Sequence, residues 1–202
     1  MCCRKTSAKV VRYSPANIDT YNNSIIYMNT LQYYISCFTS MNCNKYHGQV
    51  APHKAMMLIA VMEEIANGHL TNGYVPHHDG MVKAFESAWR RYVGKSCVFN
   101  SAFATPFYHL SNEPFWKLMK SDNYVEKKEY SLGSLRESFY GAKLPDDLSQ
   151  YMAEPASRQR LKRALLDKFV PNWSDNEDTW MVAESEIEYS NPDKKQSFRM
   201  VA

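Results

Sequence analysis

The sequence lacks any long hydrophobic run. Its longest uninterrupted apolar stretch, Ala55 to Met62, is eight residues long, whereas a membrane-spanning helix needs about 18 or more. The opening residues, Met1 to Lys5, lead into polar sequence without the apolar core of a signal peptide. We therefore expect no membrane partner and no secretion.

The sequence also lacks a regular cysteine pattern. The chain has five cysteines, an odd number with irregular spacing, and such a set does not predict a disulfide framework. Reduced thiols are typical of proteins kept in a reducing compartment. We therefore expect the protein to be cytoplasmic.

Two clusters of metal-binding residue types lack the spacing of a metal site. Cys37, Cys43 and His47 lie close together in the sequence, and residues 77–79 form a His-His-Asp cluster. Neither cluster has the paired CxxC or HExxH spacing of zinc sites. The sequence therefore predicts no metal and no other cofactor.

No catalytic motif is present. The sequence contains no GxSxG nucleophile elbow, no phosphate-binding loop and no dinucleotide-binding fingerprint. We therefore name no catalytic residues and expect a chain that is not an enzyme by itself. A diverged nuclease is the alternative that this absence leaves open.

Charge is distributed unevenly along the chain. The formal net charge is +3, but residues 1–170 carry 21 Lys+Arg against 14 Asp+Glu, and residues 171–202 carry 3 against 7. A basic body suits an anionic partner such as nucleic acid. The acidic tail could screen that body or simply aid solubility.

The same shift in composition predicts the domain organisation. Residues 1–20 have little pattern and are expected to form an N-terminal arm. Residues 21–171 are expected to form one domain, and residues 172–202 an acidic C-terminal extension. A length of 202 residues is enough for one domain with a substantial core.

Apolar periodicity predicts a mostly helical domain. The run after Pro52 is apolar on all sides, which is typical of a buried helix, and Asn67-Gly68 is a typical helix end. Residues 42–48 are expected to form a loop, and residues 74–76 a short extended segment. The predicted helices are 22–41, 52–66, 80–92, 134–140, 146–153 and 155–169.

Aromatic-rich runs predict a small sheet. Residues 105–110 and 115–119 flank the turn-forming segment Ser-Asn-Glu-Pro, a pattern that indicates a β-hairpin. Residues 124–130 are expected to add a short strand. The predicted fold is therefore α+β, a predominantly helical single domain with a small antiparallel β-hairpin or sheet.

One candidate anion site lies at the start of the buried helix. His53 and Lys54 occupy its first turn, where unpaired N–H groups and partial positive charge favour an anion such as a phosphate. Alternatively, Lys54 is a solvated surface lysine and His53 a capping or core histidine.

Two further groups of residues are candidates for binding DNA or another anion. Thr105, Pro106 and His109 lie among aromatic residues that could form a dry, shallow pocket or fill the core. The basic residues of the last predicted helix could track DNA phosphates. They are Arg158, Arg160, Lys162 and Arg163.

Four segments, taken in order, resemble a known family. They are Gly48–Lys54 (GQVAPHK) before an apolar helix, Phe85 with Trp89, the pair Pro106–Leu110 and Phe115–Leu118, and the closing segments Leu148–Met152, Pro155–Arg158 and Leu161–Leu166. Together they resemble the N-terminal DNA-reading domain of McrA-like HNH restriction endonucleases, over about residues 25–171. The HNH nuclease signature, a histidine near zinc-binding CxxC pairs, is absent.

The resemblance implies a ligand. In several members of that family this region is a sulfur-binding domain, which recognises DNA with a phosphorothioate in its backbone. A sulfur atom is larger and less strongly hydrated than oxygen, so an apolar pocket accepts it at a smaller desolvation cost. By position, His53 and Lys54 would approach the modified phosphate, while Thr105, Pro106 and His109 would line the sulfur pocket.

The expected function is therefore a DNA-binding module of a restriction or defence system, selective for phosphorothioated duplex DNA. A separate nuclease subunit is an expected partner. A diverged nuclease and a protein-interaction subunit that kept the scaffold are the alternatives.

Overall fold

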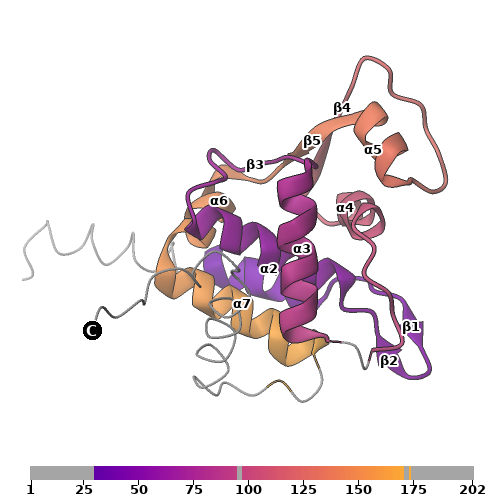
Figure 1. The fold of residues 1–202 in the computed structure, drawn as a ribbon. Coiled ribbons are helices and arrows are strands. Elements are labelled where there is room, and N and C mark those ends of the chain that lie inside the picture. Colours follow the sequence, from indigo (N-terminus) through magenta and orange to yellow (C-terminus); the bar gives the residue numbers. More distant parts are fainter. Residues whose placement is uncertain (1–29, 95–96, 171–172, 174–202) are drawn as a thin grey trace, which may run out of the picture. The chain divides into compact units, whose positions relative to one another are not determined.

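The computed structural model describes residues 30–94, 97–170 and 173 (Figure 1). The chain divides into two units, residues 1–171 and 172–202, and every described residue except Trp173 belongs to the first. The predicted arm, residues 1–20, lies outside the described residues, as does the predicted acidic extension apart from Trp173.

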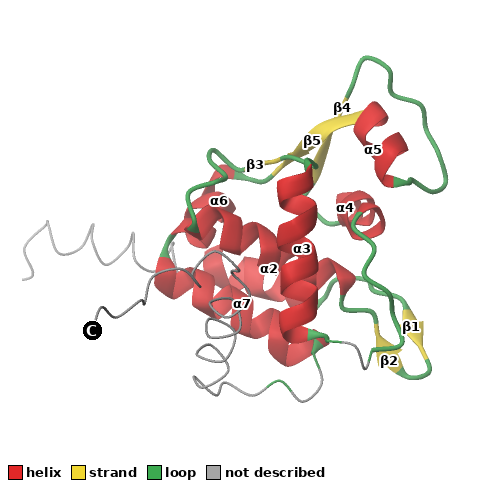
Figure 2. Ribbon diagram, viewed as in Figure 1, coloured by secondary structure: helices red, strands yellow, loops and turns green. Residues whose placement is uncertain are grey.

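The fold class is α+β, as predicted. Helices form most of the described structure, and the strands form two small antiparallel sheets (Figure 2). Residues 30–39 are helical, which agrees with the predicted first helix there, whereas residues 22–29 lie outside the described part of the chain.

Helix α2 (His53–Ala66) is the centre of the core. Every residue from Lys54 to Met62 is buried, because α2 packs against four other helices. This explains why the run is apolar on all sides. The helix ends at Asn67, and Gly68 adopts a φ of +74°, as the sequence predicts. The surrounding helices are α3 (Asp79–Tyr92), α4 (Ala104–His109), α6 (Asp146–Ala153) and α7 (Pro155–Phe169).

Side-chain caps fix where two of these helices begin. His78 Nδ1 accepts a hydrogen bond from the Met81 amide at the start of α3. The Glu154 carboxylate accepts hydrogen bonds from the amides of Ala156 and Ser157 at the start of α7. These hydrogen bonds from Ser157 and Ala156 lower the pKa of Glu154. The predicted boundaries of α3, α6 and α7 are confirmed to within one residue.

The larger sheet has three antiparallel strands in the order β3-β5-β4. Its strands are β3 (Tyr74–Val75), β4 (Lys117–Lys120) and β5 (Phe139–Lys143). The extended segment predicted at 74–76 is therefore confirmed as β3. The central strand β5 contains Gly141, whose φ is +156°, and the ring of Tyr74 crosses it, with the Tyr74 hydroxyl donating to the Tyr140 carbonyl at 2.7 Å.

The hairpin predicted from residues 105–110 and 115–119 is wrong. The first run forms α4 and then the short 3-10 helix η1 (Leu110–Asn112), whereas β4 pairs with β5. Pro106 lies in the first turn of α4, where a missing N–H costs nothing. The rings of Phe103 and Phe107 stack 5.4 Å apart at the i, i+4 spacing of a helix. Local helical packing therefore overrides the strand preference of the aromatic residues.

Three further predictions need correction. Residues 124–130 form no strand and remain a loop. The helix predicted at 134–140 is α5 (Leu132–Ser138), and the next residues begin β5. The loop predicted at 42–48 contains strand β1 (Lys45–Tyr46) and the turn of a hairpin whose second strand, β2 (Gln49–Val50), follows directly.

Candidate nucleic-acid interface

His53 is the first residue of α2 and is held by a backbone carbonyl. Its Nε2–H donates to the Asn100 carbonyl at 2.8 Å, and its ring centroid lies 4.7 Å from that of Trp89 and 5.7 Å from that of Phe99. Burial lowers the pKa of His53, although the hydrogen bond to Asn100 opposes this shift. The neutral ring thus donates through Nε2 and presents Nδ1 as an acceptor.

Lys54 is buried and paired. Its Nζ lies 2.5 Å from Glu113 Oε1, and the two side chains are only 9% and 11% exposed. Glu113 follows η1, so this salt bridge ties the first turn of α2 to the segment that leads into β4. Lys54 is therefore not the solvated surface lysine of the alternative interpretation, and its Nζ faces a carboxylate inside the protein rather than an open anion site.

The predicted pocket residues on α4 divide between two faces. Thr105 and His109 are exposed and one helical turn apart, whereas Pro106 is buried. The hydrogen bond from His53 to Asn100 attaches the start of α2 to the segment that precedes α4, and the two helices pack against each other. The structure therefore brings both predicted segments into one region, with Pro106 turned toward the core.

The basic residues of α7 mostly hold helices together. Arg158 Nη1 donates to the carbonyls of Met152 and Ala153 at the end of α6. Lys162 Nζ lies 3.0 Å from Glu63 Oε1 on α2. Arg163 Nε lies 3.8 Å from Asp167 Oδ2, and Arg160 is exposed. Helix α7 packs against α2 and α6.

The β1–β2 hairpin is a feature of this region that sequence reasoning missed. Lys45, Tyr46 and Gln49 are exposed, and the Tyr46 ring lies 6.3 Å from that of Phe99, the neighbour of His53. At its tip His47 and Gly48 have φ values of +49° and +78°, which are typical of a two-residue hairpin turn. A His-Gly pair between two short polar and aromatic segments was the available signal.

An open pocket of about 440 Å³ is the second missed feature. It lies on the other end of α4 from the helix start, between η1, β4 and the loop after β4. Aromatic rings and two lysines dominate its lining. The lining residues are Tyr108, Ser111, Pro114, Trp116, Lys117, Leu118, Lys120, Tyr124 and Phe139. The aromatic pair Phe115-Trp116, followed by Lys117 and Lys120, was the signal in the sequence.

Among the described residues, neither a metal-binding cluster nor a membrane-spanning helix is found. No three His, Cys, Asp or Glu side chains among them come together in a way that could hold a metal ion. None of their helices combines the length and apolar composition needed to cross a bilayer.

Comparison with models of protein families gives no match to this chain, and comparison with curated proteins gives none either.

Proposed function

We propose that the chain is a DNA-binding module, not catalytic by itself, which recognises phosphorothioated duplex DNA for a restriction or defence system with a separate nuclease subunit. The observation that carries this proposal is the position of the exposed β1–β2 hairpin beside His53. The selectivity for phosphorothioate comes from the resemblance to the sulfur-binding domains of McrA-like endonucleases.

The hairpin has the size and chemistry of a groove-reading element. The major groove of DNA admits a two-stranded β-ribbon. Gln49 can pair with the edge of adenine, while Lys45, on the opposite face of the ribbon, can contact a phosphate. Both side chains are exposed on the ribbon, so neither needs rearrangement to reach DNA.

The start of α2 supplies a place for the modified phosphate. Pro52 provides no side-chain cap, and the first turn of α2 contains no acidic residue, so its N–H groups suit an anion. Phe99 beside His53 is partly exposed and offers an apolar surface for sulfur. Phe99 thus takes the role that the resemblance gave to Pro106, while Thr105 and His109 contribute polar contacts from α4.

A mobility-shift experiment with matched duplexes tests this function. One duplex carries a single phosphorothioate and the other does not. We expect salt-sensitive binding of both, with tighter binding of the modified duplex. Equal affinity would eliminate sulfur recognition, and failure to bind either duplex would eliminate DNA binding.

Two lysine variants locate the interface. Lys45→Ala removes a cation from the hairpin, whereas Lys168→Ala removes an exposed cation from the end of α7. We expect only Lys45→Ala to weaken binding and to lower the salt dependence by about one phosphate contact. Equal effects of both variants would contradict the placement of DNA at the hairpin.

A further inference from the structure

The open pocket between η1, β4 and the following loop has its own chemistry. Four aromatic residues line it, and Trp116 among them is only 2% exposed. The indole N–H of Trp116 is buried without a hydrogen-bond partner in the part of the chain that the structure describes. Buried donors are nearly always satisfied in folded proteins, so the pocket wall holds an unused donor.

Two lysines supply positive charge at the same place. Lys117 and Lys120 are exposed on β4, and neither forms a salt bridge within the described ranges. Lys120 Nζ lies 4.0 Å from the centroid of the Tyr124 ring, a cation–π contact that holds the charge beside the aromatic wall. The nearby Asp122 carboxylate accepts a hydrogen bond from the Tyr140 hydroxyl at 2.9 Å, so its hydrogen-bond partner is this tyrosine and not one of the two lysines.

We infer that this pocket binds one unpaired nucleotide of a DNA strand, with its base against the partly exposed rings of Tyr108 and Tyr124 and its phosphate at Lys117 and Lys120. Nucleobases stack on aromatic side chains whatever their sequence, and lysines track the backbone. A volume of about 440 Å³ lies within the range of about 300–1,000 Å³ that is typical of small-molecule sites.

The inference rests on the proposed function for the source of the nucleotide. A paired base is enclosed in the stack of the duplex and cannot enter a pocket, whereas a mispaired, bulged or terminal base leaves the stack at a smaller cost. The pocket would therefore add recognition of an unpaired position to the reading of the duplex by the hairpin.

Calorimetric titration of the full chain with deoxyadenosine monophosphate tests the site directly. Inorganic phosphate and deoxyribose 5-phosphate serve as probes without a base. We expect the nucleotide to bind more tightly than either, because only the nucleotide can stack. Equal binding of all three would overturn the role of the aromatic wall, and no binding of the nucleotide would overturn the inference.

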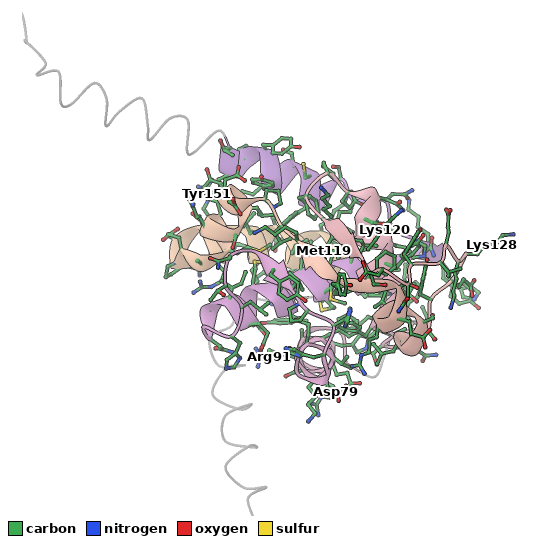
Figure 3. The ribbon with its side chains drawn as sticks, turned by 90° about the horizontal axis from the view of Figure 1, so that it is seen from above. Asp79, Arg91, Met119, Lys120, Lys128 and Tyr151 are labelled. Carbon is green, nitrogen blue, oxygen red and sulfur yellow. The ribbon has the colours of Figure 1, made fainter. Side chains whose placement is uncertain are left out.

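Two double lysine variants test which lysines bind the phosphate of the nucleotide. Lys117→Ala/Lys120→Ala removes both pocket lysines, and Lys127→Ala/Lys128→Ala removes two exposed lysines of the adjoining loop that do not line the pocket. Figure 3 shows Lys120 beside Met119 of β4 and Lys128 extending away from it. We expect the first variant alone to weaken nucleotide binding, by about tenfold for the loss of charge-assisted contacts. Equal effects of the two variants would overturn the assignment.

Tyr124 tests stacking independently of charge. Tyr124→Trp keeps an aromatic ring and Tyr124→Ala removes it, so we expect the tryptophan variant to bind the nucleotide and the alanine variant to lose most binding. Thermal melting of both variants separates lost stacking from lost folding. Retained binding by a folded Tyr124→Ala would contradict a base on this wall.

A final comparison separates the pocket from the duplex interface. A duplex with one unpaired adenosine should bind more tightly than the fully paired duplex, and Lys117→Ala/Lys120→Ala should remove this difference. Lys45→Ala should weaken both duplexes without changing binding of the free nucleotide. Duplex binding without any preference for the unpaired adenosine would overturn the inference alone. Nucleotide binding without duplex binding would overturn the proposed function and DNA as the source.

Discussion

Lys54 and Glu113 form a salt bridge that is almost wholly buried, with Nζ and Oε1 2.5 Å apart. The pair joins residues 59 positions apart in the sequence. It fixes the first turn of α2 against the segment that leads into β4, and it therefore connects the proposed duplex interface to the wall of the nucleotide pocket.

Removing one partner of this pair should be costly. Glu113→Leu leaves the Lys54 ammonium buried without a counter-charge, and we expect a loss of about 3 kcal/mol in the free energy of unfolding. The double variant Lys54→Met/Glu113→Leu should lose less than the single variants Lys54→Met and Glu113→Leu together, because it buries no lone charge. Urea denaturation of all four proteins measures the coupling, and strictly additive losses would contradict it.

His53 should make stability depend on pH. Burial lowers the pKa of His53 from its ordinary value of 6.5 in the folded protein, so below that value the unfolded chain binds the proton more readily. The contribution to stability is therefore complete above pH 6.5 and is lost as the pH falls toward the folded pKa. His53→Gln should flatten this part of the profile in urea denaturation. Parallel profiles for variant and wild type would contradict the assignment.

Gly141 and Gly133 should respond oppositely to alanine. At Gly141 a Cβ atom would lie 2.7 Å from the Val75 carbonyl oxygen, at a φ of +156°, so Gly141→Ala should destabilise the sheet by about 2 kcal/mol. At Gly133, in α5, the nearest atom would be Ser131 Oγ at 3.9 Å. Gly133→Ala should therefore stabilise the protein by about 0.5 kcal/mol. Thermal melting should show shifts of opposite sign.

Glu63 joins three helices through two cations. Its Oε1 lies 3.1 Å from Arg91 Nη1 on α3 and 3.0 Å from Lys162 Nζ on α7. Glu63→Gln should lower the free energy of unfolding by about 1 kcal/mol, less at high salt. Glu86, exposed on α3, is the matched control, and Glu86→Gln should change stability little. Equal effects would show that the bridging position contributes nothing.

The sequence predicted the helices whose ends and buried faces are marked by residues within the helix or next to it. Pro52, Asn67 and Gly68 mark the ends of α2, and the apolar spacing of α3 and α7 is regular. The strands were harder because each depends on a distant partner: β5 pairs with both β3 and β4. Gly141 in β5 gives no strand signal in the sequence. A glycine is needed there because the ring of Tyr74 lies against its Cα, and this contact is visible only in the structure.

The candidate site was predictable in position but not in chemistry. The sequence indicated His53 and Lys54 at a helix start, and the structure has them there. Their partners, Asn100 and Glu113, lie 47 and 59 residues away, and no local pattern announces them. Pro106 was predicted to line a pocket, but the sequence did not show that it lies in a helix. The helical turn of α4 directs Pro106 into the core.

The burial of α2 has a consequence for folding during translation. This helix leaves the ribosome early, yet α6 and α7, which cover part of it, are the last described helices to be made. Until then its apolar surface has no native cover, so the nascent chain presents a strong binding site for chaperones and a risk of aggregation. Translation stalled before α6 would therefore yield a fragment that depends on chaperones to remain in solution.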